Sequence, residues 1–211
     1  MQIGNSSRKG NAMRFVLVTA ALVLQVLSIG WLIVRYERVV QTGAEVRFKC
    51  RAYDPYDPLR GRYLNISIDE ATTNVAAAVA NEVDSRVCGC FARIEPSTNG
   101  LWCVAEVAER SGSEGIWVKP SDVRMERLLT WSDKKEGANW SEFEERRKAS
   151  PLVARVSFPD RFFVNEKIAP EAEEVLRKKT EEAVAVYRVL DGEIVLTGID
   201  LNGRSILDCV K

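Results

Sequence analysis

The chain has 211 residues, of which 46% are hydrophobic and 28% are charged, and its 30 basic side chains balance its 30 acidic ones. This composition fits one folded domain of ordinary size and excludes a disordered or fibrous protein. The sequence contains no histidine, which excludes Ser-His and Cys-His catalytic pairs and every histidine-ligated zinc site.

The charges are distributed unevenly along the chain. Residues 1–34 carry three basic side chains and no acidic one, so acidic side chains outnumber basic ones over residues 35–211. Charge-driven binding of nucleic acid needs a basic domain or a basic face. The charge balance therefore predicts no nucleic-acid partner.

The N-terminal region predicts a short basic tail at residues 1–14 and a transmembrane helix at residues 15–34. The span carries no charge, and a helix of this length extends about 30 Å, the thickness of a bilayer's hydrocarbon core. The alternative is a cleaved signal peptide, whose apolar region of about 7–15 residues is shorter and is followed by small residues. Because charged residues follow the span instead, we expect an anchor that stays in the lipid bilayer.

The flanking charges do not fix the orientation of this span. Basic side chains lie close to both of its ends, with Arg14 on one side and Arg35 on the other. The positive-inside rule compares the basic residues of the two flanks, so it gives no direction here.

Beyond the span, residues 35–211 predict a single mainly β domain of the β-rich α+β class. Residues 44–51 and 62–68 alternate apolar with polar side chains, which is the pattern of strands with one buried face. Residues 87–94 and 101–107 flank a loop rich in Pro, Ser, Asn and Gly, which predicts a β-hairpin.

Short helices are expected between these strands and the C-terminus. Residues 70–84 are rich in alanine and predict a short helix. Residues 108–150 are polar and poorly periodic, apart from a helix that Asn139 can cap. Pro170 suits the first turn of a further helix.

The C-terminal region, residues 183–210, predicts a three-stranded meander. Its apolar runs are separated by Asp191-Gly192 and by Asn202-Gly203, the residue pairs that favour two-residue hairpin turns.

Cys90 and Cys103, two of the five cysteines, lie on partner strands of the predicted hairpin. A turn centred on residues 96 and 97 sets them opposite each other, with Cβ atoms about 4.5–5.5 Å apart, close to the separation that a disulfide needs. This geometry predicts a disulfide in an oxidising compartment. A turn centred on Asn99-Gly100 would instead shift the register and separate the two cysteines. The alternative is that both cysteines are small apolar core residues. Cysteine spacing and the lack of histidine predict no metal site.

Two further segments stand out. The first is Asp54–Ser67, which reads DPYDPLRGRYLNIS, and the second begins at Arg161 and reads RFFVNE. Both resemble segments of the GDYXXLXY family of membrane-anchored bacterial proteins. The first resembles the family signature, although Arg62 stands where the signature has an aspartate, and the second is similar to a family segment that leads into a helix. Together they supply the candidate binding residues: Asp54, Asp57, Arg60, Gly61, Arg62, Tyr63, Arg161, Asn165 and Glu166.

The resemblance implies a location and a partner. It implies a single-pass anchor in the inner membrane of a bacterium, with the C-terminal domain outside the cytoplasm, in the periplasm. It also implies a multi-pass membrane protein as a partner. Because Arg62 reverses the charge of the signature aspartate, a function that needs that carboxylate is not implied for this chain.

Two functions are consistent with the sequence. The first is a membrane-anchored accessory or interaction protein of the bacterial envelope without catalytic activity. The alternative is an envelope enzyme or small-ligand-binding domain that uses the segment Asp54–Tyr63. The sequence shows no catalytic constellation, so we assign no catalytic residue and no cofactor. For Arg60 and Arg62, a rigid turn in which Asp54 or Asp57 pairs with an arginine is the alternative to a binding role.

Overall fold

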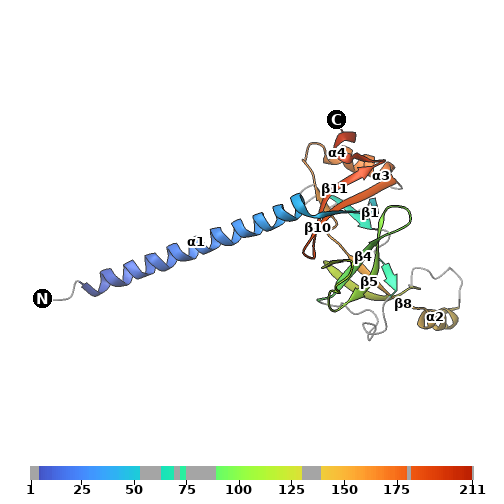
Figure 1. The fold of residues 1–211 in the computed structure, drawn as a ribbon, viewed down its shortest axis with the longest axis horizontal. Coiled ribbons are helices and arrows are strands. Elements are labelled where there is room, and N and C mark those ends of the chain that lie inside the picture. Colours follow the sequence, from blue (N-terminus) through green and yellow to red (C-terminus); the bar gives the residue numbers. More distant parts are fainter. Residues whose placement is uncertain are drawn as a thin grey trace. The chain divides into compact units, whose positions relative to one another are not determined.

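The chain forms two units in a computed structural model, Met1–Thr42 and Gly43–Lys211. Figure 1 shows their helices and strands. The structure describes residues 5–52, 63–68, 72–74, 89–129, 139–179 and 182–210.

The first unit is one long helix, α1 (Asn5–Thr42). Its segment Met13–Thr42 is long and apolar enough to cross a membrane, and it is the one such helix among the described residues. The helix continues past residue 34 because residues 35–42 lack Gly and Pro and form contacts one turn apart. In one of these contacts the Arg35 guanidinium lies 5.5 Å from the centroid of the Trp31 ring. The β-rich unit therefore begins at Gly43 rather than at residue 35.

The second unit is built on a six-stranded antiparallel sheet. The strands follow the order β12-β11-β10-β1-β2-β9. They are β1 (Ala44–Ala52), β2 (Tyr63–Ile68), β9 (Arg161–Phe163), β10 (Ala183–Leu190), β11 (Glu193–Leu201) and β12 (Arg204–Ser205). Strand β9 ends the sheet and also approaches β11, so the sheet is strongly curved.

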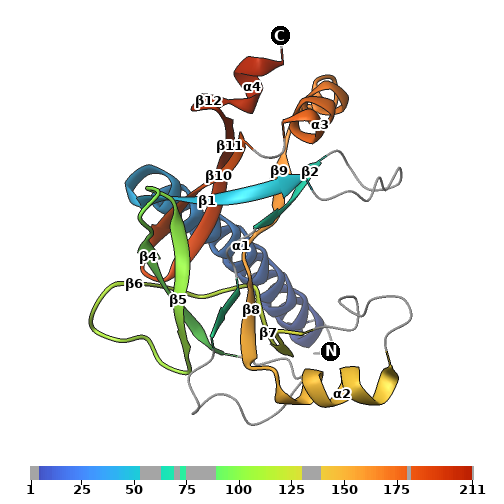
Figure 2. The same cartoon turned by 90° about the vertical axis from the view of Figure 1, so that its right-hand side faces the viewer.

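Among the described residues, this unit also has two three-stranded sheets and three short helices (Figure 2). One sheet has the order β3-β8-β7: β3 (Thr72–Asn74), β8 (Leu152–Ser157) and β7 (Asp122–Arg127). The other has the order β5-β4-β6: β5 (Trp102–Ala108), β4 (Phe91–Pro96) and β6 (Ile116–Val118). The helices are α2 (Trp140–Ala149), α3 (Ala169–Lys178) and α4 (Ile206–Cys209).

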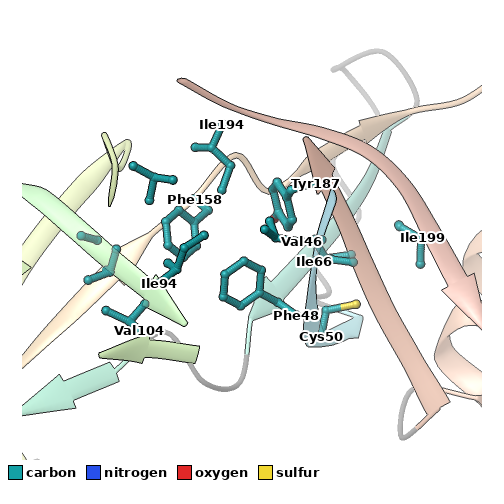
Figure 3. Close-up of a cluster of buried hydrophobic side chains, with 14 of the residues drawn as sticks. Val46, Phe48, Cys50, Ile66, Ile94, Val104, Phe158, Tyr187, Ile194 and Ile199 are labelled. Atoms are coloured by element: carbon teal, nitrogen blue, oxygen red, sulfur yellow. The ribbon is translucent and has the colours of Figure 1, made fainter. Parts of the chain in front are cut away.

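One hydrophobic core joins the sheets. In β1, Val46, Phe48 and Cys50 are fully buried while the residues between them are not, which confirms the predicted alternation. The Phe48 ring packs between Phe158 and Tyr187, at centroid distances of 5.2 Å and 5.8 Å (Figure 3). The structure thus confirms a β-rich α+β domain behind an apolar N-terminal helix.

The predicted meander is confirmed in both of its turns. Asp191, Gly192, Asn202 and Gly203 all have positive φ, as two-residue hairpin turns of this kind require. Its last strand is shorter than predicted, because β12 ends at Ser205. The Ser205 side chain then accepts a hydrogen bond from the Leu207 amide and starts α4, which buries Ile206.

The predicted hairpin forms with a different register. Strand β4 pairs with β5 so that Glu95 lies opposite Cys103, and the turn falls at residues 97–101 rather than at 96 and 97. Cys90 precedes β4, which begins at Phe91, and Phe91 already pairs with Ala108. The predicted opposition of Cys90 and Cys103 is therefore wrong. The Cys103 Sγ instead lies 3.7 Å from the Glu95 carbonyl oxygen.

Several short elements differ from the prediction. Within residues 70–84, residues 72–74 form strand β3 rather than helix, and the rest of that segment lies outside the described residues. Strands β6 and β7 lie in the region that showed no periodicity. Two helix predictions are confirmed: Asn139 caps α2 by accepting from the Ser141 amide, and Pro170 lies in the first turn of α3.

Candidate functional site

The structure describes four of the nine candidate binding residues: Tyr63, Arg161, Asn165 and Glu166. The other five, Asp54, Asp57, Arg60, Gly61 and Arg62, lie outside the described residues. The segment that contains them leads directly into β2 at Tyr63.

The two segments that carry the family resemblance meet in the sheet. Strand β2 pairs antiparallel with β9, so Tyr63 lies opposite Phe163 and Asn65 lies opposite Arg161 (Figure 2). Nearly one hundred residues separate these strands in the sequence. Residues Leu64 and Ile66 face the core, so their neighbours on β2 point to the other face.

On that outer face, Tyr63, Arg161 and Phe163 form a compact group, here called the β2–β9 cluster. The rings of Tyr63 and Phe163 are 6.0 Å apart, and the Arg161 guanidinium lies 5.1 Å from the centroid of the Tyr63 ring. Phe163 is 75% exposed, and the Arg161 side chain is 52% exposed. Such a cluster leaves an aromatic and cationic surface open to a partner.

The loop before β9 is fixed by hydrogen bonds from three parts of the domain. The carbonyl of Ser157 accepts from the Ser121 amide at 2.8 Å, and the carbonyl of Asp160 accepts from the Ile66 amide at 3.0 Å. Between them, the buried Tyr187 hydroxyl donates to the Pro159 carbonyl at 2.7 Å. These bonds hold the chain where it crosses from β8 to β9, and so they position Arg161.

A family model described as GDYXXLXY protein matches residues 25–199. The chain belongs to the GDYXXLXY family. The matched region contains both β2 and β9, so the β2–β9 cluster lies inside the part that the family shares. No curated protein and no solved structure matches the chain.

Asn165 and Glu166 have a different setting in this GDYXXLXY protein. The Asn165 side chain accepts a hydrogen bond from the Lys167 amide, and its carbonyl accepts from the amides of Ile168 and Ala169, each at 3.0 Å. Asn165 therefore shapes the turn that begins α3, while Glu166 is exposed in the same turn. The structure brings Tyr63 and Arg161 into contact and assigns Asn165 to the support of the helix.

Two further residues of this region were not predicted. Phe163 is the most exposed large apolar side chain of the second unit among the described residues. The sequence prediction named Arg161 from the same segment and not Phe163. Asn65 carries a side-chain oxygen that is buried without a hydrogen-bond partner among the described residues. An aromatic residue two positions after a motif arginine, on the same face of a strand, is the signal that could have identified Phe163.

The described residues contain no group of three or more Cys, Asp or Glu side chains placed to hold a metal ion. The chemistry that this site offers is recognition. A guanidinium held on a ring presents its N–H groups to a carboxylate or another acceptor, and the exposed aromatic side chains supply apolar contact area.

Proposed function

We propose that this GDYXXLXY protein is a membrane-anchored interaction protein of the bacterial envelope that binds a multi-pass membrane protein. Helix α1 is the anchor, and the β2–β9 cluster is part of the contact surface. The observation that carries this proposal is that both family segments converge on one exposed aromatic and cationic cluster.

The composition of the cluster supports this function. Interface hot spots are enriched in Trp, Tyr and Arg and are surrounded by residues that exclude water. The Phe163 side chain is largely exposed to water, and a partner that covers it buries its apolar surface. Full burial of such a side chain stabilises a complex by about 1.5–3 kcal/mol. The pairing of β2 with β9 holds these side chains in place before binding, which lowers the entropic cost of association.

The proposed location is the inner membrane, with the C-terminal domain on the periplasmic side. The apolar segment of α1 supports the anchor, and the family resemblance supports the orientation. A reporter fused after Val210 tests the orientation. Alkaline phosphatase is expected to be active there and green fluorescent protein dark, whereas the reverse pattern would place the domain in the cytoplasm.

Co-purification tests the interaction. The full chain, expressed at its native level and extracted with a mild detergent, is expected to retain a multi-pass membrane protein at a fixed stoichiometry. The Phe163→Ser variant is expected to lose most of that partner. Leu128→Ser is the matched control, because Leu128 is also an exposed apolar residue, at 57%, and lies outside the cluster. Recovery of the wild-type chain alone would refute the proposed function.

A further inference from the structure

The outer face of strands β1, β2 and β9 is basic. In β1 the residues that alternate with the buried ones are Arg47, Lys49 and Arg51, and in β9 the corresponding residue is Arg161. Strands β2 and β9 contain no acidic residue, and β1 contains one, Glu45.

Two acidic side chains of this face, Glu45 and Asp200, engage the cations nearest the start of β1. Glu45 pairs with Arg47 at 2.8 Å and with Arg188 at 2.9 Å, and Asp200 lies 3.9 Å from Arg47. These contacts balance the charge around the entry of the chain into the sheet. Among the described residues, these contacts do not extend to β9 at the other side of β1 and β2.

Arg51 and Arg161 lie on the part of the face that is next to the β2–β9 cluster. Arg51 is opposite Ser67 and Arg161 is opposite Asn65, so one strand with small polar side chains separates the two cations. Strand spacing places their Cα atoms about 12 Å apart. Among the described residues, Arg161 has one acidic contact, with Asp160 at 3.9 Å. Both side chains are more than half exposed, so this ion pair is weak.

We infer that this face, defined by Arg51, Tyr63, Arg161 and Phe163, binds an acidic protein segment that also carries apolar side chains. A guanidinium stacked on a ring is held in the orientation that a carboxylate bridges with two hydrogen bonds. The exposed Phe163 and the adjoining Tyr63 provide contacts for an apolar side chain of the same segment. This inference rests on the proposed function, because the partner supplies the segment.

A defined probe tests the chemistry. The full chain in detergent micelles is titrated with a fluorescent random copolymer of glutamate and tyrosine, with polyglutamate, and with phosphatidylglycerol vesicles. We expect the copolymer to bind more tightly than polyglutamate. The variants Arg161→Glu and Arg51→Glu are expected to weaken copolymer binding about tenfold or more, because each places a like charge against the probe. Arg110→Glu, a reversal at an exposed loop arginine, is the matched control and is expected to have less than about a twofold effect.

The remaining outcomes would overturn the inference. These are no copolymer binding, equal binding by all variants, polyglutamate binding as tight as that of the copolymer, or binding of the vesicles alone through Arg161. If Arg161→Glu lowers the melting temperature, the variant Arg161→Gln is used instead. It is expected to weaken binding of the copolymer about threefold or more.

Failure of this inference is distinguishable from failure of the proposed function. If a membrane partner co-purifies but stays bound in high salt and with Arg161→Glu, the interaction stands and the acidic segment is refuted, since salt shortens the Debye length from about 10 Å at 0.1 M to about 3 Å at 1 M. If no partner co-purifies and the copolymer still binds in the expected order, the membrane partner is refuted and the chemistry of the face stands.

Discussion

A single buried hydroxyl links the core to the candidate site. Tyr187 is fully buried, and its ring takes part in the same aromatic packing that Phe48 and Phe158 form. The ring of a phenylalanine would pack in the core at this position equally well. The hydroxyl group adds the hydrogen bond to Pro159, two residues before Arg161.

The variant Tyr187→Phe tests this link. It removes the donor and leaves the Pro159 carbonyl without its 2.7 Å partner, so we expect the free energy of unfolding to fall by about 1–3 kcal/mol. Chemical denaturation of the second unit in the full chain, followed by near-ultraviolet circular dichroism, measures the change. Tyr63→Phe, at a partly exposed tyrosine, is the matched control and should alter stability by less than about 0.5 kcal/mol. Equal stability of Tyr187→Phe and wild type would contradict the assigned role.

The same hydroxyl predicts a dependence on alkaline pH. Burial raises the pKa of Tyr187 well above its ordinary value of 10.0, and the nearby Cys50 and Asp160 raise it further. The folded state therefore favours the protonated hydroxyl. The contribution of Tyr187 to the free energy of unfolding is fully present below the pKa that the group has in the unfolded chain, and it is lost as the pH rises through the pKa in the folded state. Above about pH 10, the stability of the wild type should fall more steeply than that of Tyr187→Phe, by up to about 1.4 kcal/mol per pH unit. Parallel stability curves for the two proteins would show that Tyr187 does not titrate in this way.

At the scale of elements, the turns of the C-terminal meander have the clearest consequence. Gly203 has φ of +77°, and a Cβ added there would have no heavy atom within 4 Å. Its replacement is therefore limited by backbone conformation rather than by space. We expect Gly203→Val to lower stability by about 1–2 kcal/mol, because a β-branched residue resists the left-handed region.

Gly203→Asn is the control for that prediction. Asparagine tolerates the left-handed conformation, so the same position should accept it with a smaller loss. Thermal unfolding of the two variants separates the cases. If valine and asparagine reduced the melting temperature equally, the resistance of a β-branched residue to the left-handed region would not be the source of the loss.

Sequence periodicity predicted the long elements because each buries a regular face. The alternation in β1 and the turn residues of the meander are local signals, and the structure confirms both. Strands β3 and β9 have three residues each, too few for a period of two to be visible. The register of the β4–β5 hairpin depended on which residues of a five-residue loop form its turn, and the turn forms where Gly100 has a positive φ and its amide donates to the Ser97 carbonyl.

The candidate site shows the same limit. The two family segments could be found in the sequence, but the contact of Arg161 with Tyr63 arises from a pairing between strands far apart in the chain. No local pattern encodes such a pairing. The exposure of Phe163 depends on the same pairing, so it became visible only in the folded sheet.

At the scale of the whole molecule, α1 is both longer than the predicted span and uninterrupted. Its 30-residue segment Met13–Thr42 extends about 45 Å as a helix, compared with about 30 Å for a bilayer's hydrocarbon core. The uncharged part, residues 15–34, is sufficient to span that core. Residues 35–42 then continue the helix with charged side chains, which belong in the interface or in water.

This division predicts that charge is tolerated at one end of α1 and not at its centre. Leu24→Arg places a cation at the middle of the uncharged part, which costs about 2.5–3.5 kcal/mol on insertion scales. Val40→Arg makes the same change in the charged continuation and is expected to have little effect. The fraction of full-length chain that resists carbonate extraction from membranes measures insertion, and intact mass shows whether residues 1–34 remain attached. Equal extraction of both variants, or a mature N-terminus near Glu45, would show that α1 is not a retained membrane anchor.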